Sequence, residues 1–444
     1  MKRILLVFIS IVLVHSTYAQ WAPMASGPGG VVRALCVHQG VLYAGGDFPG
    51  LVKKWTGSAW VAVPTLSGTS SPKVNALISY NGFLYAGGSF SLSASNFNVA
   101  KLSGNSWVPV GEGLQGVAGS EVKAFCVYGG ALYVGGTFTQ TGTASLSKVG
   151  KLNAGGTAWD QVGGIAPPKC QAGVYAMTVY QSELYVGGEG SAPFVNKLSL
   201  STGQWAEMPG GITGGTGVYA LSPFKYPNPT TSLFVGGKFS APFTTCCTYT
   251  SSGWGTALNT FSGGNDEIRC LLASAAGTTG AIYAGGTFTV NGATNLAKKP
   301  VLTPWAAEGT NTFNGKVRAM CFFEQGIIAA GDFTSPGTNV AKFATTIGID
   351  EVSENVIVNN VFPNPVIHDA LLKVQTVEQM HQPELRMMDA TGNVVSFAGE
   401  MTKFDRSSNE IEYKISSEGL ATGLYYYVLV DQQQNIASGK LIIE

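Results

Sequence analysis

The chain has 444 residues, of which 59 are glycine, close to twice the usual share of about 7%. Charged residues make up only 12%, about half the usual share, so tight turns are expected to outnumber long solvated helices. The formal net charge is zero, which removes the electrostatic footprint of a protein that binds nucleic acid or an anionic membrane.

Residues 1–19 have the pattern of a signal peptide. Lys2 and Arg3 precede an apolar run, residues 4–14, that is too short to span a bilayer. The small residues that follow predict cleavage after Ala19, so the mature chain is expected to begin at Gln20. No later stretch is apolar for long enough to cross a membrane. We therefore expect a protein that is secreted or held at the outer cell surface.

A segment of four short strand patterns recurs seven times between residues 20 and 345. In its first copy the four patterns are Val32–Val37, Val41–Phe48, Leu51–Trp55 and Trp60–Val63. A Gly-Gly pair recurs in the second pattern, 42 residues apart from Gly45 to Gly87 and 52 residues apart from Gly135 to Gly187. This period suits one blade of a β-propeller, so seven copies predict seven blades. We expect the glycines to end the second strand, at a positive φ or a close backbone approach.

The seventh copy lacks the strand, headed by a Trp, that ends each earlier copy. It reaches Val340–Phe343 and stops, whereas Trp21–Met24 directly follows the predicted cleavage site and resembles Trp60–Val63. The first strand of the mature chain is therefore predicted to complete the last blade. Such closure would remove the exposed sheet edges of an open ring.

The repeat resembles the kelch repeat. The shared features are a Gly-Gly pair, then an apolar or aromatic residue in the third strand, then a Trp five to seven residues later, as in Gly45-Gly46, Trp55 and Trp60. The resemblance covers residues 20 to about 345. It implies an all-β fold, the seven-bladed propeller of kelch proteins and of the galactose oxidase central domain.

The seven cysteines of an exported chain raise the question of disulfides. Three of them occupy one repeat position that Ile78 and Leu272 fill in other copies, which favours buried thiols: Cys36, Cys126 and Cys321. Cys246 and Cys247 are adjacent, and a strand would point them to opposite faces. A disulfide framework is therefore not expected.

The Gly-Gly pattern ends near residue 345. We interpret residues 346–354 as a linker and residues 355–444 as a second β-domain, long enough for a small sandwich. Four motifs follow one another in it: Phe362-Pro363-Asn364-Pro365, Asp389–Val394, Leu420–Tyr425 and Lys440–Ile443.

In that order the motifs resemble the type A C-terminal sorting domain of type IX secretion. The resemblance implies export from a Gram-negative cell by the Sec route, passage through the outer membrane with the secretion machinery as partner, and usually removal of the domain. Its motif residues here are Phe362, Pro363, Asn364, Pro365, Gly423, Tyr425 and Lys440. An accessory sandwich of another purpose is the alternative.

The galactose oxidase resemblance can be tested against the histidine content, because that enzyme's copper needs two His ligands. Of four histidines, His15 would leave with the signal peptide, and His368 and His381 lie in the sorting domain. Only His38 remains in the predicted propeller, which excludes a two-His copper or zinc site there. We interpret His38 as an ordinary polar residue and expect no metal and no cofactor.

Catalysis is also disfavoured by the other motifs. Sialidases are propellers that gather three Arg, but the Ser-x-Asp-x-Gly-x-Thr-Trp box is missing, and no Asp-x-Asp-x-Asp run predicts a calcium loop. A glycosidase needs two facing carboxylates. Asp47, Glu189 and Asp332 each follow Gly-Gly or its counterpart and are interpreted as isolated, solvated turn residues. No catalytic residue is assigned.

One variable position of the first strand collects polar and aromatic residues, namely Arg33, Asn75, Lys123, Tyr175, Tyr219, Arg269 and Arg318. In kelch-like propellers this position lies near one mouth of the central channel, so the resemblance implies a ligand-binding surface. The three Arg belong to consecutive blades and are expected to form the most positive patch, which suits carboxylate or sulfate groups. The alternative is that each long side chain merely covers the blade below it.

The lack of paired His and paired carboxylates favours a non-enzymatic binding protein. The predicted function is binding of an extracellular ligand, an acidic polysaccharide or a protein partner. An extracellular enzyme that acts on polysaccharide is the alternative, and a cluster of Asp or Glu at one channel mouth would favour it. A structural role at the cell surface is the third interpretation.

Overall fold

The computed structural model describes residues 20–343 and 356–444, apart from short gaps. The gaps are residues 67, 69–70, 94–96, 117–118, 164–169, 200–201, 227–229, 257–260, 262–265, 275–279, 302, 310–311, 325, 377–379, 382, 390–393 and 432–433. The predicted signal peptide and linker lie outside the described residues. The chain divides into two compact units, residues 1–344 and 345–444.

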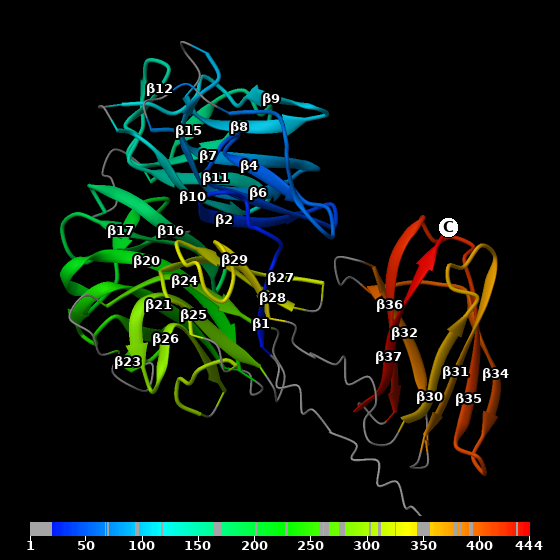
Figure 1. Ribbon diagram of the computed structural model, residues 1–444. Coiled ribbons are helices and arrows are strands. Elements are labelled where there is room, and N and C mark those ends of the chain that lie inside the picture. Colours follow the sequence, from blue (N-terminus) through cyan, green and yellow to red (C-terminus); the bar gives the residue numbers. More distant parts are fainter. Residues whose placement is uncertain are drawn as a thin grey trace, which may run out of the picture. The chain divides into compact units, whose positions relative to one another are not determined.

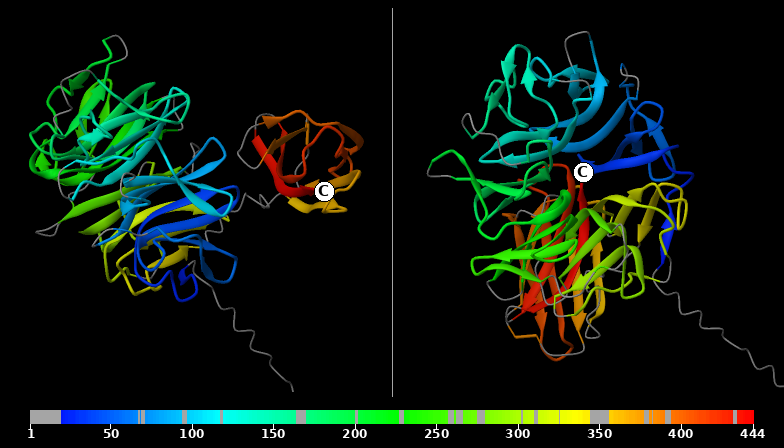
Figure 2. Two further views of the ribbon diagram at one scale, coloured as in Figure 1. Left: turned by 90° about the horizontal axis from the view of Figure 1, so that it is seen from above. Right: turned by 90° about the vertical axis from the view of Figure 1, so that its left-hand side faces the viewer.

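Where the structure is described, both units are built from β-strands and turns, without a helix (Figure 1). Figure 2 shows the same strands from two further directions. The predicted all-β class is confirmed. No helix capable of crossing a membrane is found in the described part of the chain.

The first unit contains seven groups of antiparallel strands, one for each sequence repeat. The first three groups are β2 (Val31–His38), β3 (Val41–Asp47), β4 (Val52–Trp55), β5 (Trp60–Ala62); β6 (Lys73–Tyr80), β7 (Phe83–Ser91), β8 (Phe97–Ser103), β9 (Ser106–Pro109); and β10 (Val122–Tyr128), β11 (Ala131–Gly136), β14 (Val149–Leu152), β15 (Trp159–Gln161). A small hairpin, β12 (Gln140–Thr141) and β13 (Ala144–Ser145), interrupts the third.

The fourth and fifth groups are joined through one residue pair, Glu189 and Gly217, into an eight-stranded sheet. Their strands are β16 (Gly173–Tyr180), β17 (Glu183–Glu189), β18 (Val195–Leu198), β19 (Trp205–Glu207); and β20 (Thr213–Lys225), β21 (Thr231–Ala241), β22 (Cys246–Thr250), β23 (Gly253–Thr256). The last two groups are β24 (Glu267–Ala273), β25 (Ala281–Val290), β26 (Ala293–Pro300); and β27 (Val317–Phe323), β28 (Gly326–Gly331), β29 (Val340–Phe343), β1 (Trp21–Pro23).

The first strands of the seven groups contact one another in a closed cycle. β2 contacts β6, and the contacts continue through β10, β16, β20, β24 and β27, which in turn contacts β2. The contact between β27 and β2, which are far apart in the sequence, closes the cycle. The first strand of every group therefore lies beside the first strands of two other groups.

The N-terminal strand β1 pairs with β29, with Trp21 opposite Phe343. Six of the described tryptophan indoles donate to a backbone carbonyl of the preceding group: Trp21 to Glu308, Trp60 to Met24, Trp107 to Pro64, Trp159 to Val110, Trp205 to Val162 and Trp254 to Pro209. Trp21 thus makes the bond to the sixth group that a tryptophan of the seventh group would make.

The sixth group differs from the expectation at its tryptophan. Trp305 is completely buried, but it lies in no strand, and the neighbouring Ala306 forms only an isolated bridge with Lys298 of β26. The predicted fourth strand is therefore reduced to one residue pair in this group.

The paired glycines are the last two residues of the second strand in β11, whereas β7, β21 and β25 continue beyond them, and none of them has a positive φ. A Cβ atom on Gly45 would lie 2.5 Å from a methyl carbon of Val74 in the next group, and one on Gly46 would lie 2.0 Å from the backbone oxygen of Val31. Close packing, both between groups and across the strand pair, therefore requires glycine here. In the seventh group Ala330 takes the first of the two positions.

All seven cysteines are free. Cys170, Cys246 and Cys247 are buried, whereas Cys36, Cys126 and Cys321 are only partly buried against the core, so the expectation of buried thiols is met in part for these three. Their surroundings are nonetheless desolvated enough that burial raises the pKa of the Cys36 thiol to about 11.

The second unit consists of two four-stranded antiparallel sheets. One is formed by β30 (Val356–Phe362), β31 (Asp369–Thr376), β35 (Glu410–Ser416) and β34 (Gly399–Asp405), the other by β33 (Val394–Val395), β32 (Glu384–Asp389), β36 (Gly423–Asp431) and β37 (Gln434–Ile443). Alternate residues, such as Leu372 and Val374 on β31 and Leu429 on β36, are completely buried in one core. This alternation is the reason why the segment forms two packed sheets.

Candidate functional site

Each of the seven residues predicted to bind a ligand is the extra residue of a β-bulge. In the first group, Arg33 has no partner between the pairs Val32–Gly46 and Ala34–Gly45. The register shifts at the equivalent place in every other group, at Asn75, Lys123, Tyr175, Tyr219, Arg269 and Arg318. A bulge redirects a side chain out of the regular alternation of a strand, and bulges are frequent beside functional sites.

The structure brings all seven residues together. They line one cavity of about 110 Å³, to which each of the seven groups contributes its bulged residue. The reason is the cycle of contacts among the first strands, which places equivalent positions side by side. We call these seven residues, together with the acidic side chains bonded to them and the lysines paired with those acids, the ring site.

Two arginines of the ring site are held by aspartates that end, or directly follow, the second strand of the same group. Arg33 donates from Nε and Nη2 to the two carboxylate oxygens of Asp47, at 2.5 and 2.7 Å. Arg318 makes the same two-point contact with Asp332. Both pairs use one edge of the guanidinium, so the remaining N–H groups of each arginine are left for another acceptor.

Glu121 is the centre of a second group of contacts. Its carboxylate is bonded to Lys123 at 2.7 Å, to Lys73 at 3.0 Å and to the side-chain amide of Asn75 at 2.7 Å. Burial disfavours the ionised form of Glu121, but the hydrogen bonds from the two lysines and Asn75 outweigh it, so that the pKa of Glu121 is lowered. Since Lys73 and Asn75 belong to β6, this carboxylate links the second and third groups.

Glu267 has the same role between the sixth and seventh groups. It is paired with Arg269 at 2.7 Å and with Lys316 of the neighbouring group. Burial again opposes ionisation, and the hydrogen bonds from Arg269 and Lys316 again lower the pKa of Glu267. The guanidinium of Arg269 also lies 3.8 Å from the ring centroid of Tyr219, within cation–π distance.

The two tyrosines of the ring site share one carboxylate. Tyr175 and Tyr219 meet edge to face, with centroids 5.5 Å apart. Their hydroxyls donate to opposite oxygens of Glu189, at 3.2 Å from Tyr175 and 2.8 Å from Tyr219. Burial raises the pKa of Tyr219 to about 12 and raises that of Tyr175 as well, so both remain neutral donors.

The ring site pairs each of its three arginines with a carboxylate. Its described members carry six cations, Arg33, Lys73, Lys123, Arg269, Lys316 and Arg318, and five carboxylates, Asp47, Glu121, Glu189, Glu267 and Asp332. Six positive and five negative charges leave a sum of only one positive charge. Every cation has an acid beside it.

Five acidic residues were thus missing from the predicted site. Asp47, Glu189 and Asp332 are not isolated turn residues, because each is bonded to a side chain that lines the cavity. Glu121 directly precedes β10 and Glu267 begins β24, each two residues before Lys123 and Arg269, and the period of two in extended backbone places such pairs on one face. That spacing is the signal that could have found them.

His38 lies at the end of β2 and contacts the hydroxyl of Ser79 at 2.8 Å through Nδ1. Burial lowers the pKa of His38. Within the described residues, no three His, Cys, Asp or Glu side chains are grouped so that they could hold a metal ion.

In the second unit, the first and last sorting motifs meet. The side-chain amide of Asn364 donates to the carbonyl of Lys440 at 3.1 Å, and its oxygen accepts from the backbone of Ile442 at 2.9 Å. Next to it, Val366 is completely buried and pairs with Ile443. The motif around Asn364 therefore fastens the last strand, whereas Phe362 is 52% exposed.

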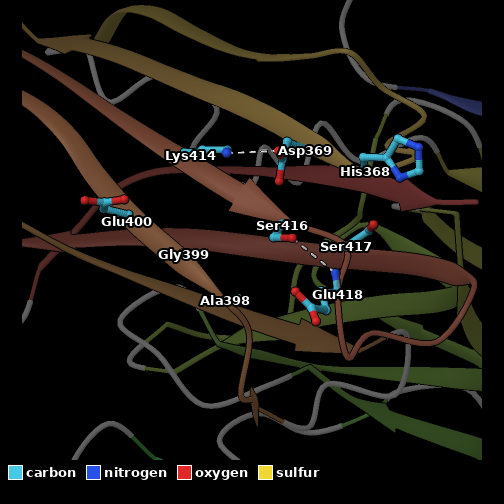
Figure 3. A pocket seen from close by; sticks show the side chains of 9 residues that line it. All are labelled: His368, Asp369, Ala398, Gly399, Glu400, Lys414, Ser416, Ser417 and Glu418. Atoms are coloured by element: carbon cyan, nitrogen blue, oxygen red, sulfur yellow. Dashed lines mark hydrogen bonds and ion pairs between the residues drawn. The ribbon is translucent and has the colours of Figure 1, made fainter.

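A larger and more open cavity of about 890 Å³ lies in the second unit (Figure 3). Its lining includes His368, an ion pair between Asp369 and Lys414 at 2.9 Å, and Glu400. The backbone N–H of Glu418 donates to the hydroxyl of Ser416 at 3.3 Å. The sequence motifs predict none of these residues as functional.

The comparisons with known proteins identify the second unit alone. Residues 360–444 match the family model of the secretion system C-terminal sorting domain. No significant match to a curated protein is found. The match therefore excludes the alternative interpretation, in which this unit is an accessory sandwich that serves another purpose. Residues 360–444 are a type IX sorting domain, so the protein is secreted or displayed at the cell surface and interacts with the type IX secretion machinery.

Proposed function

We propose that the first unit is a seven-bladed, kelch-like β-propeller that binds an extracellular glycan at the ring site, after the signal peptide has been removed behind Ala19. The seven strand groups, the closed cycle of first strands and the pairing of β1 with β29 support the propeller. The sorting domain supports an extracellular place of action.

One observation carries the binding function. Seven repeats that are far apart in the sequence each contribute a bulged, polar or aromatic side chain to a single cavity. A purely covering role would require only long side chains, whereas these are ordered by paired acids and by aromatic contacts. Side chains that are fixed by such neighbours lose little freedom when a ligand binds.

The chemistry of the ring site favours a glycan over a protein partner. Fixed arginines and lysines donate hydrogen bonds, carboxylates accept them, and two tyrosine rings offer apolar faces and edges, a combination that suits sugar hydroxyls and ring carbons. The free edges of Arg33 and Arg318 suit a carboxylate or sulfate, so an acidic polysaccharide remains the favoured class. A cavity of about 110 Å³ would hold one such group rather than a protein surface.

An enzyme that acts on polysaccharide is the second candidate, because five carboxylates gather at the ring site. Glycoside hydrolysis needs one carboxyl group that is protonated near neutral pH. The hydrogen bonds to Glu121 and Glu267 outweigh their burial and lower the pKa of both, which does not suit a general acid. Glu121 and Glu267 are therefore poor candidates for a general acid, which favours binding over hydrolysis at these two carboxylates.

A glycan array probed with the purified full chain tests the proposal, with acidic, neutral and amine-bearing glycans side by side and protein ligands as a further arm. The variant Arg33→Lys/Arg318→Lys keeps both charges but loses the forked contact, so it should bind acidic glycans about tenfold more weakly. Arg386→Lys is the matched control, since Arg386 makes a forked contact with Glu384 in the sorting domain.

Binding to proteins alone, or to no glycan, would overturn the proposal, and release of shortened glycan products would favour the enzyme.

A further inference from the structure

Glu189 differs from the other four carboxylates of the ring site. Asp47, Glu121, Glu267 and Asp332 are each paired with at least one arginine or lysine. Among the residues that the structure describes, the carboxylate of Glu189 accepts hydrogen bonds from the hydroxyls of Tyr175 and Tyr219, and no cation is paired with it. Its negative charge is thus the one in the ring site that no neighbouring cation balances directly.

Backbone pairing and a close glycine contact fix the position of Glu189. It ends β17 and pairs with Gly217 of β20, the single pair that joins the fourth and fifth groups. A Cβ atom on Gly217 would lie 2.9 Å from Cγ of Glu189 and 2.5 Å from the carbonyl oxygen of Gly188. The absence of a side chain on Gly217 therefore leaves space for the side chain of Glu189 where the fourth and fifth groups meet.

The two tyrosines beside Glu189 fix the position of its carboxylate but carry no positive charge that would neutralise it. Because burial raises the pKa of Tyr175 and Tyr219, both hydroxyls remain protonated and can only donate to the carboxylate. An ionised carboxylate has about four lone-pair directions, and the two tyrosines use two of them. An ammonium group, with three N–H donors, would satisfy the remainder and balance the charge.

The surrounding rings also favour a cation. Arg269 lies over the face of Tyr219, and Lys123 lies 5.3 Å from the ring centroid of Tyr175. Both of these cations have their own acid, Glu267 and Glu121, so they do not neutralise Glu189. Aromatic rings are common partners of bound ammonium groups.

We infer that Glu189, held by Tyr175 and Tyr219, binds the ammonium group of an amino sugar within the glycan ligand. The inference rests on the proposed function and adds a second contact to it. The arginine pole, Arg33 and Arg318, lies where the seventh group meets the first, whereas Glu189 lies where the fourth meets the fifth. The ligand that satisfies both poles is a glycan with an unacetylated amino sugar and a neighbouring acidic group.

The test compares two probes that differ only at nitrogen, glucosamine oligomers and their N-acetylated counterparts, at a pH where the amine is protonated. The full chain should prefer the amine by about tenfold, the usual weight of a hydrogen bond to a charged group. Glu189→Gln keeps the shape and removes the charge, so the preference should disappear. Glu183→Gln is the matched control, because Glu183 is on the same strand but is paired with Lys197 outside the ring site.

The outcomes separate this inference from the proposed function. Equal binding of both probes by the full chain, or a preference that survives in Glu189→Gln, overturns the ammonium contact while glycan binding stands. No binding to these probes or to acidic glycans overturns both. Tyr219→Phe provides a second variant with an unchanged ring shape, and it should also reduce the preference, because the carboxylate loses its donor at 2.8 Å.

Discussion

The indole N–H of Trp21 donates to the backbone carbonyl of Glu308, 287 positions further along the chain, over 2.9 Å. Trp21 is only 3% exposed and packs edge to face on Phe313, with centroids 5.0 Å apart. The sixth and the seventh strand groups are thereby joined by a side chain from the start of the described chain.

Replacing this tryptophan should loosen the whole first unit. Trp21→Ala removes a large buried side chain and a hydrogen bond, a loss of about 3–5 kcal/mol in the free energy of unfolding. Thermal or denaturant unfolding, followed by fluorescence of the remaining tryptophans, measures it. Trp254→Ala is the control, since Trp254 makes the equivalent bond but is more exposed, and it should cost clearly less. Equal losses would contradict a special role of Trp21 in closure.

Removal of residues 20–24 tests the same closure by deleting the whole strand, including the buried Trp21 and Met24. The deletion takes away β1 and leaves β29 with one unpaired edge. The unfolding midpoint should fall, because both the ladder and the burial of Trp21 are lost. An unchanged midpoint would show that the last strand group is complete without β1.

Replacing a glycine of these pairs should cause a packing conflict between strand groups. Gly45→Ala places a methyl group 2.5 Å from Val74, so it should destabilise the protein by about 1–3 kcal/mol. The double variant Gly45→Ala/Val74→Ala should cost less than the sum of the two single changes, because the smaller side chain gives the new methyl room. A double-mutant cycle on unfolding free energies measures the difference, and additive effects would argue against this contact.

The lowered pKa of Glu121 predicts acid sensitivity. Because its folded pKa lies below the ordinary value of 4.5, its ionised form stabilises the protein at pH values above 4.5, and this contribution is lost as the pH falls through the folded pKa. Glu121→Gln should therefore flatten the fall of the unfolding midpoint between about pH 5 and pH 2. Glu324→Gln, at an exposed pair with Lys342, should leave the profile unchanged. Parallel profiles for wild type and Glu121→Gln would contradict the prediction.

Deletion of residues 345–444 tests the sorting domain. Since the two units are separate compact bodies, the first should remain folded while the protein stays inside the cell envelope. Cell fractionation with an antibody against the first unit locates it. Asn364→Ala is a subtler version, because it removes both bonds to the last strand and should reduce export in proportion to the loss. Normal release of the deleted form would contradict the sorting role.

The sequence predicts the repeats, the N-terminal strand and the seven residues of the cavity because each depends on local pattern and period. It does not predict the partners of those residues. Whether Asp47 reaches Arg33, or Glu121 reaches Lys73, depends on the bulge and on the packing of neighbouring groups. The burial of Trp305 without a strand likewise reflects packing that no local pattern contains.

The glycine pairs illustrate the same limit. Their recurrence predicts a positive φ or a close backbone approach near the end of each second strand, and the structure shows the close approach, because a neighbouring valine and a backbone oxygen leave no space for a side chain. A sequence shows that glycine recurs, but only the assembled sheets show what approaches it.

The pairing of β1 with β29 also has a mechanical consequence. The chain leaves β29 at Phe343 and continues into the sorting domain, so a pull on that domain acts first on β29. This strand is hydrogen-bonded on both sides, to β28 and to β1, whereas β1 itself is an edge strand. A protein tethered to the cell by its C-terminal end would therefore bear the load of flow on an interior strand with two ladders of bonds.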